Sequence, residues 1–162
     1  MNDESTADTL IGLISDTHGL LRPSVHPALA GVELILHAGD VGGHDILEEL
    51  RTIAPVMAVY GNTDPAGDPE LEGTLVIERG GVKIRVVHGH EAGRLTPEGL
   101  GAKYEEQVVI FGHTHRQMIV TSRNRLFVNP GAAGQRRFDL RPSVAKLTVG
   151  SGKASAEIIE ID

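Results

Sequence analysis

The chain has 162 residues, no cysteine and a formal net charge of −7 at pH 7. This length predicts one domain with a single core, and the lack of cysteine excludes a disulfide scaffold and a thiolate zinc site. The acidic balance, without a run of lysine or arginine, argues against a nucleic-acid partner and favours a small substrate.

The N-terminal residues 1–8 are polar and acidic, and we expect them to form a disordered or loosely held leader before a domain at residues 9–162. They do not resemble a signal sequence, and no apolar stretch in the chain approaches the length of a membrane span. We therefore expect a cytoplasmic protein with no membrane partner.

The first half of the chain alternates strands and helices. Apolar runs at Leu10–Ile14, Leu34–His37 and Val56–Tyr60 predict short buried strands. The segments Arg22–Ala30 and Gly42–Thr52 lie between them and predict crossover helices, the second with an apolar stripe at helical spacing. This order predicts parallel strands in an α/β fold.

The second half is mostly β. The pair Gly80-Gly81 predicts a hairpin turn between strands at Thr74–Arg79 and Val82–Val87. A short helix at Pro97–Glu106 and a buried strand at Val108–Phe111 follow. Two further strand pairs are predicted at 117–122 with 126–129 and at 143–149 with 154–161. Edge strands in the last pair could join two chains, so a homo-oligomer is possible.

Polar segments follow the predicted strands where each should end. They are Asp16-Thr17-His18, Gly39-Asp40, Gly61-Asn62-Thr63-Asp64, His88-Gly89-His90, Gly112-His113-Thr114-His115 and Asn129-Pro130-Gly131. In open α/β sheets, ligands bind outside the carboxyl ends of the strands. Side chains at positions i and i+2 of an extended segment point to one side, so each pair can present two ligands to one point.

Each segment alone has a simpler interpretation, because Asp and Asn are common turn formers and a single His often packs in a core. Ser15 and Thr17 are interpreted as turn and cap residues rather than nucleophiles. His37 is expected to pack at a strand end, and His26 to lie on the surface. Together, however, the oxygen and imidazole side chains predict a hydrolytic site with two metal ions.

The blocks D-x-H, G-D, G-N, H-G-H, G-H-x-H and N-P-G occur here in the order of a known family. The chain from Leu10 to Ile161 resembles the calcineurin-like metallophosphoesterase superfamily, and within it the small phosphodiesterases of the YfcE and VPS29 type. The resemblance implies an α/β fold, a four-layer αββα sandwich of two mixed β-sheets flanked by helices. It also implies hydrolysis of a small phosphate ester, above all a phosphodiester, by a metal-bridging hydroxide.

The resemblance further implies how the ligands divide between two divalent ions. One ion is held by Asp16, His18, Asp40 and His115, and the other by Asp40, Asn62, His88 and His113, with Asp40 as the bridge. Mixed carboxylate, amide and imidazole ligands suit borderline-hard ions. Manganese is the first expectation, and iron, nickel, cobalt or zinc would also fit.

One position departs from the family pattern. Many superfamily members carry a His after the G-N block that helps protonate the leaving oxygen, whereas this chain has Thr63. His90 and His44 are the candidate replacements. We therefore expect Asp40, Asn62 and His90 to be catalytic, and Thr63, His90 and His44 to contact the substrate. Without the usual acid, esters with good leaving groups, such as aryl esters, should react best.

Two other functions remain open. One is a protein-binding scaffold of the VPS29 type with weak or no catalysis, although aromatic residues, which often dominate such interfaces, are scarce here. The other is a nuclease that shares the metal blocks, although the chain lacks a basic run.

Overall fold

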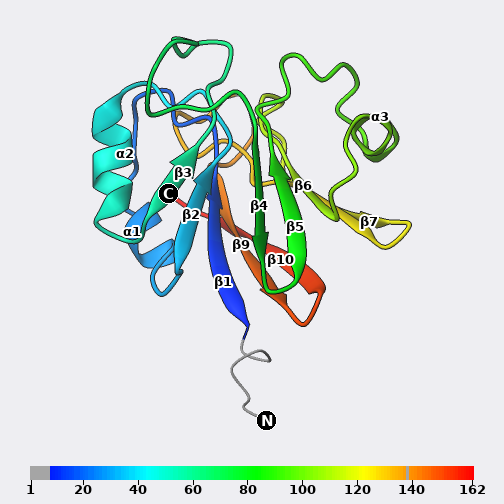
Figure 1. Ribbon diagram of the computed structural model, residues 1–162. Helices are drawn as coiled ribbons and strands as arrows, with labels where there is room; N and C mark the ends of the chain where they lie inside the picture. The colour runs from blue at the N-terminus through cyan, green and yellow to red at the C-terminus, as the bar shows by residue number, and fades with distance from the viewer. Residues whose placement is uncertain (1–7, 138) are drawn as a thin grey trace.

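Two five-stranded sheets pack face to face in the computed structural model, which describes residues 8–137 and 139–162 (Figure 1). The first sheet has the order β10-β9-β1-β2-β3, with β1 Thr9–Ile14, β2 Leu34–His37, β3 Val56–Ala58, β9 Ser143–Gly150 and β10 Lys153–Glu160. The second has the order β4-β5-β6-β8-β7, with β4 Leu75–Arg79, β5 Val82–Val86, β6 Val108–Ile110, β7 Met118–Ser122 and β8 Arg125–Asn129. Most of the expected leader, residues 1–7, lies outside the described residues.

Both sheets are mixed, as the family resemblance implies. Strands β1, β2 and β3 pair in parallel, and so do β5, β6 and β8. The remaining pairings, β1 with β9, β9 with β10, β4 with β5 and β7 with β8, are antiparallel. Each of the six parallel strands runs directly into one of the predicted polar segments, which places these segments at strand carboxyl ends.

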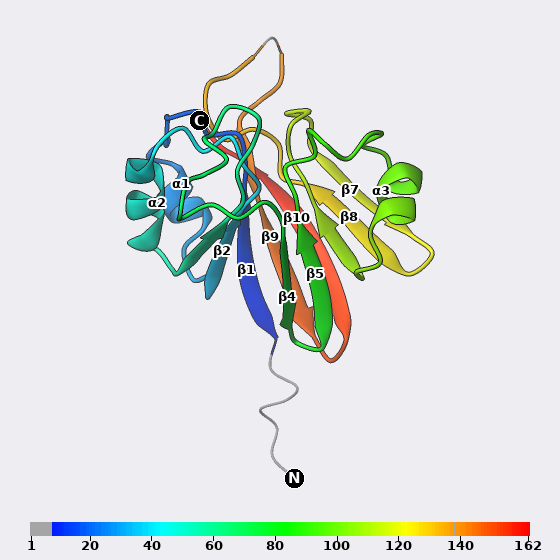
Figure 2. The ribbon, with the colours of Figure 1, turned by 45° about the horizontal axis from the view of Figure 1, so that its top comes forward.

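Two helices, α1 (Val25–Ala28) and α2 (His44–Arg51), cover the outer face of the first sheet (Figure 2). The stripe of α2 is buried there through Ile46, Leu47 and Leu50, as its helical spacing predicts. Helix α1 is shorter than the predicted segment 22–30. Pro27 has no N–H to bond a carbonyl four residues earlier, so the helix starts late, and Gly31 follows its end with a left-handed φ of 88°.

Helix α3 (Pro97–Lys103) covers the outer face of the second sheet, so the four layers αββα are confirmed (Figure 2). The Thr96 hydroxyl caps it by accepting a hydrogen bond of 3.1 Å from the Gly99 N–H. Its buried Leu100 packs against a cluster that includes Phe111 and Phe127. The helix ends before the predicted boundary because the backbone becomes extended at Tyr104, with φ −120° and ψ 149°.

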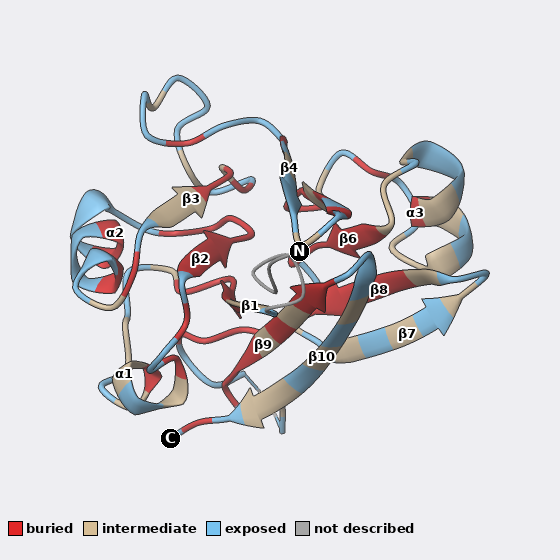
Figure 3. Ribbon diagram, turned by 60° about the horizontal axis from the view of Figure 1, so that its bottom comes forward, coloured by how far each residue is buried: buried red, intermediate tan, exposed pale blue. Residues whose placement is uncertain are grey.

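Burial follows the position of each strand in its sheet (Figure 3). Strand β6 is buried throughout, and β8 and β9 nearly so, whereas the edge strands β7 and β10 have no buried residue. The main core lies between the sheets, where branched side chains of both inner faces interdigitate. In the part of the chain that the structure describes, no helix is long and apolar enough to cross a membrane.

Candidate metal centre

The structure brings together the seven residues for which the sequence predicts a ligand role. They lie at the ends of five parallel strands and are Asp16, His18, Asp40, Asn62, His88, His113 and His115. Backbone hydrogen bonds tie their loops to one another. The Asp16 N–H donates to the Gly39 carbonyl (3.0 Å), the His18 N–H to the Asp40 carbonyl (2.9 Å) and the Gly112 N–H to the His88 carbonyl (3.0 Å).

Five of these seven residues have a backbone conformation that side chains disfavour. The φ angles of Asp16, His18, Asp40, His113 and His115 lie between 48° and 70°. A left-handed φ costs about 1–2 kcal/mol per non-glycine residue. Such outliers gather at functional sites, where the surrounding structure holds them in place.

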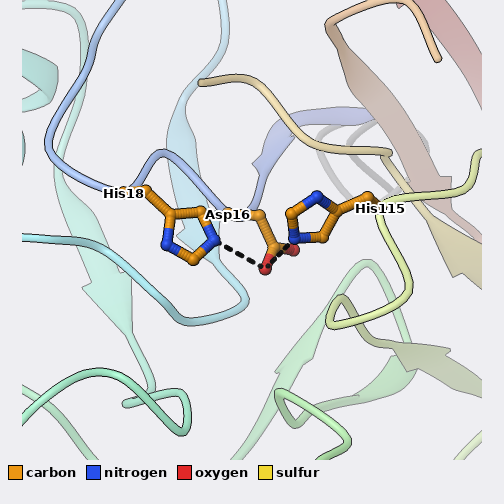
Figure 4. Close-up of side chains that lie close together, drawn as sticks. All are labelled: Asp16, His18 and His115. Atoms are coloured by element: carbon orange, nitrogen blue, oxygen red, sulfur yellow. Dashed lines mark ion pairs between the residues drawn. The ribbon is translucent and has the colours of Figure 1, made fainter. Parts of the chain in front are cut away.

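One half of the cluster contains Asp16, His18 and His115 (Figure 4). The Asp16 Oδ1 atom lies 3.7 Å from His18 Nε2 and 3.3 Å from His115 Nε2. Asp16 Oδ1 and His18 Nε2 are both buried, and neither has a hydrogen-bond partner among residues 8–137 and 139–162. A buried carboxylate oxygen is costly without a partner, and a cation would satisfy both atoms.

The other half is arranged around His88. Its Nδ1 atom must donate to the Ala38 carbonyl, 2.8 Å away, because a carbonyl only accepts. In the neutral ring, Nε2 therefore presents a lone pair, and it lies 3.3 Å from Asp40 Oδ2, 3.0 Å from Asn62 Oδ1 and 3.3 Å from His113 Nδ1. Acceptor atoms that converge in this way form a cation site.

Two carboxylates connect the halves. Asp40 Oδ2 lies 3.6 Å from His18 Nε2 and 3.3 Å from His88 Nε2, so it faces both sides of the cluster. Asp16 Oδ1 also lies 3.9 Å from His88 Nε2. The structure thus puts Asp16, as well as the predicted bridging residue Asp40, between the two groups of imidazoles.

The charges of the cluster favour a cation. Burial alone raises the pKa of Asp16, but the nearby imidazoles of His115 and His18 and the hydrogen bond from Ser15 outweigh it and hold the pKa well below its usual range. Burial likewise raises the pKa of Asp40, but the nearby His88 imidazole and the hydrogen bond from the Thr63 N–H lower it to about 2. The pKa of His18 is raised, chiefly by Asp16. Both carboxylates are therefore ionised at neutral pH, and the field around them is negative.

Ser15 and Thr17 do more than form a turn, because both are fully buried supports of the site. The Ser15 hydroxyl donates to Asp16 Oδ2 (2.6 Å), and the His113 N–H donates to the same oxygen (3.1 Å). These bonds turn Oδ1 toward the centre. The Thr17 hydroxyl donates to the Val41 carbonyl (2.7 Å) and contacts His37, which is buried as expected.

Asp64 is a supporting residue that sequence reasoning missed. Its Oδ2 atom accepts hydrogen bonds from the N–H groups of Val41 (3.0 Å) and Gly61 (2.9 Å), and Oδ1 accepts one from Gly42 (3.1 Å). One carboxylate thus joins the loop that carries Asp40 to the loop that carries Asn62. Its only sequence signal is an acidic residue in a Gly- and Asn-containing turn.

The Asn129-Pro130-Gly131 block supports the His113 loop. The Asn129 side chain accepts from the Gly131 N–H (2.9 Å), which forms a tight turn, and donates to the Gly112 carbonyl (3.1 Å). The block therefore connects the end of β8 to the loop that follows β6.

The three residues expected to contact substrate have different surroundings. The Thr63 N–H donates to Asp40 Oδ1 (2.9 Å). The ring nitrogens of His44 face Asp68 (2.6 Å) and Glu70 (3.2 Å), so His44 joins the start of α2 to the loop before β4. The ring centroid of His90 lies 5.4 Å from that of His88, and its buried Nδ1 has no partner in the described structure.

Comparisons with known proteins agree with this geometry. Residues 10–152 match the model of the calcineurin-like phosphoesterase superfamily domain. The chain is 39% identical to a protein of Methanothermobacter thermautotrophicus described as a probable metallophosphoesterase, over 93% of this chain and 91% of that protein. It is 28% identical to the phosphodiesterase MJ0936 of Methanocaldococcus jannaschii, over 75% of this chain and 82% of that protein.

A solved structure with the same fold is Vps29 of Entamoeba histolytica in complex with Zn²⁺. It has a TM-score of 0.74 and 26% identity, and the match covers 95% of this chain and all (100%) of that chain. The family model covers far more than half of the chain, and the buried ligand-type atoms of the cluster suit divalent metal ions. The chain therefore belongs to the calcineurin-like phosphoesterase superfamily.

Proposed function

We propose that this chain is a phosphodiesterase that hydrolyses a small phosphate ester at a centre with two divalent cations. The observation that carries the proposal is the convergence of buried ligand-type atoms, above all Asp16 Oδ1 and His18 Nε2, which have no hydrogen-bond partner in the part of the chain that the structure describes. One ion would be held by Asp16, His18, Asp40 and His115, and the other by Asp40, Asn62, His88 and His113. The catalytic unit is the single domain of residues 9–162.

The donor set indicates which ions would bind. Carboxylate, amide and imidazole ligands together suit manganese, iron, cobalt, nickel or zinc better than calcium, and we propose manganese first. When bound, two such ions lower the pKa of a water molecule and offset the negative charge of the phosphoryl oxygens.

The side chains have separate tasks in this proposal. Asp40 and Asn62 would hold the cations in place, and the phosphate would take its orientation from the cations. The Thr63 N–H keeps the Asp40 side chain in its rotamer. His90 contacts the ester and supplies the proton for the leaving oxygen, since its Nδ1 has no described partner and its ring lies beside His88. His44 is not proposed for this task because both of its ring nitrogens face carboxylates.

The test measures hydrolysis of bis(4-nitrophenyl) phosphate, with added manganese, by two variants that each replace one aspartate by alanine. Asp40→Ala should abolish hydrolysis and weaken metal binding in a calorimetric titration, because Asp40 faces both groups of imidazoles. Asp45→Ala is the matched control, since Asp45 is exposed on α2. Metal-saturated wild-type protein that turns over no phosphate ester would contradict the proposal.

A protein-binding scaffold is the second candidate, and the likeness to Vps29 favours it. Such a surface usually contains a large exposed apolar patch. Of the described residues, the exposed large hydrophobics are Leu20, Val76 and Ile119, which lie in a loop and on the opposite edge strands β4 and β7. Because these exposed hydrophobic residues lie far apart in the fold, they form no large patch, which supports the enzyme over the scaffold. A protein that binds metal but turns over no ester would support the scaffold instead.

A further inference from the structure

A pocket of about 300 Å³ opens beside the candidate metal centre. Its lining includes Tyr60, Gly73, Thr74, His88, His90 and Tyr104. His88 belongs also to the ligand cluster, so the pocket and the cluster share a wall. The chain has two tyrosines and no tryptophan, and both tyrosines lie in this one pocket. Two of the few aromatic side chains of this chain thus line a pocket that shares His88 with the candidate metal centre.

His90 lines the pocket and lies next to the ligand cluster. Its ring centroid lies 6.2 Å from that of Tyr60 and 5.4 Å from that of His88. Its buried Nδ1 makes no hydrogen bond to any described residue. A group that extends from a phosphate at the centre into the pocket would therefore pass His90 first.

Tyr104 lines the pocket, and neighbouring side chains fix the position of its ring. The Arg85 guanidinium carbon lies 4.8 Å from the centroid of the Tyr104 ring. Arg85 is itself held by two hydrogen bonds to the Glu106 carboxylate, 2.8 Å and 3.0 Å long. A ring whose place is set before binding loses little entropy when a ligand packs against it.

We infer that this pocket binds an organic group of the ester substrate and selects a planar aromatic ring. The inference rests on the proposed function, because it assumes that a phosphate ester lies at the centre. Aromatic rings pack favourably against other aromatic rings, and a volume of about 300 Å³ is at the lower end of small-molecule pockets. The substrate class is therefore an aryl or similar single-ring phosphate ester.

Gly73 offers a way to fill the pocket without changing a ligand. A Cβ atom there would lie 3.4 Å from the Tyr60 hydroxyl oxygen and 3.6 Å from its Cε2 atom, which is ordinary contact. A leucine at this position would therefore extend into the space beside Tyr60. Gly67 is the matched control, because it lies in the same loop and no described atom is within 4 Å of its Cβ position.

The first measurement compares kcat/KM for bis(4-nitrophenyl) phosphate and bis(2,2,2-trifluoroethyl) phosphate, whose fluorinated alkoxide leaving groups contain no ring, and follows how the ratio of the two values changes between variants. In Gly73→Leu the ratio of the two values should fall by about tenfold or more, the usual effect of losing a pocket contact. In Gly67→Leu the ratio should stay at the wild-type value. Tyr60→Leu should lower the ratio too, and it replaces Gly73→Leu if circular dichroism shows that this variant is unfolded.

The second measurement does not depend on activity. Because the chain has no tryptophan, its intrinsic emission comes from Tyr60 and Tyr104. Bis(4-nitrophenyl) phosphate added to the metal-free protein should quench this emission in a saturable way. Gly73→Leu should lose the saturable quenching, and Gly67→Leu should keep it.

The outcomes separate this inference from the proposed function. An unchanged ratio and unchanged quenching in Gly73→Leu would overturn the aromatic pocket and leave the phosphodiesterase proposal intact. Absence of turnover of both esters by metal-loaded wild type would overturn the phosphodiesterase proposal. The quenching experiment would then show by itself whether the pocket binds an aromatic ring.

Discussion

Removing the Asp64 carboxylate should loosen the metal centre although Asp64 is not one of its ligands. Three backbone N–H groups, from Val41, Gly42 and Gly61, donate to this carboxylate. A hydrogen bond to a charged group contributes about 1.5–3 kcal/mol. Because Asp64 is partly exposed and one of the three bonds is exposed, we expect Asp64→Ala to lower the free energy of unfolding by about 3 kcal/mol.

Asp64→Asn should lower the free energy of unfolding by less than Asp64→Ala does. Oδ2 accepts two of the three hydrogen bonds, so an amide oxygen in its place would keep both. We therefore expect a loss of about 1 kcal/mol in this variant. Because the carboxylate joins the Asp40 and Asn62 loops, Asp64→Ala should also weaken metal binding by about 10–100-fold, as the loss of an outer hydrogen-bond partner of a ligand usually does.

Urea unfolding of the metal-free variants, followed by circular dichroism, measures the stability, and calorimetric titration with Mn²⁺ measures the affinity. Asp68→Ala is the control, since Asp68 lies in the same loop but its side chain bonds to the exposed His44 and the exposed Glu70 N–H, neither of which is a proposed metal ligand, and exposed ion pairs contribute little. The reasoning would be refuted if Asp64→Ala matched Asp68→Ala in both measurements.

Three further predictions concern packing, pH and metal. A methyl group on Gly112 would press against the Ser15 hydroxyl, so Gly112→Ala should cost at least about 2 kcal/mol in urea unfolding, whereas Gly67→Ala should cost almost nothing. Burial lowers the pKa of His37 from 6.5 to about 4. Its stabilising contribution is therefore complete above pH 6.5 and is lost as the pH falls to 4, and the stability gap between wild type and His37→Gln should narrow by about 3 kcal/mol across this window. Mn²⁺ at a hundred times its Kd should raise the unfolding free energy by about 2.7 kcal/mol, but not in Asp40→Ala.

Each of these three predictions would be contradicted by one specific result. Equal stability losses at the two glycines would show that the close approach near Ser15 is not present. A gap between wild type and His37→Gln that stays constant with pH would show that His37 is not buried in its neutral form. An equal rise with Mn²⁺ in Asp40→Ala would place the metal elsewhere.

The strand ends could be predicted from sequence because their signals are local. A buried parallel strand reads as a short apolar run, and the polar segment after it marks where pairing stops. Helix boundaries were less accurate where one residue decides the outcome. Pro27 delays the start of α1, and the extended backbone at Tyr104 ends α3 before Glu106.

The supporting hydrogen bonds could not be predicted in this way, since most of them join distant parts of the chain. The Asp64 carboxylate bonds to an N–H 23 residues earlier, at Val41, and the His113 N–H bonds to Asp16 across 97 residues. Sequence spacing carries no information about which loops meet. The role of Asp64 therefore becomes visible only when the two loops lie side by side.

The sequence by itself determined the kind of chemistry, because ligand-type side chains after apolar runs can be read without knowing how the strands pack. The tertiary structure decided which atoms face each other, with Asp16 beside Asp40 between the imidazoles and two distant tyrosines in one pocket. The physical reason is that residue type and period are properties of a local segment. Orientation and cavity shape arise only when two sheets close on each other.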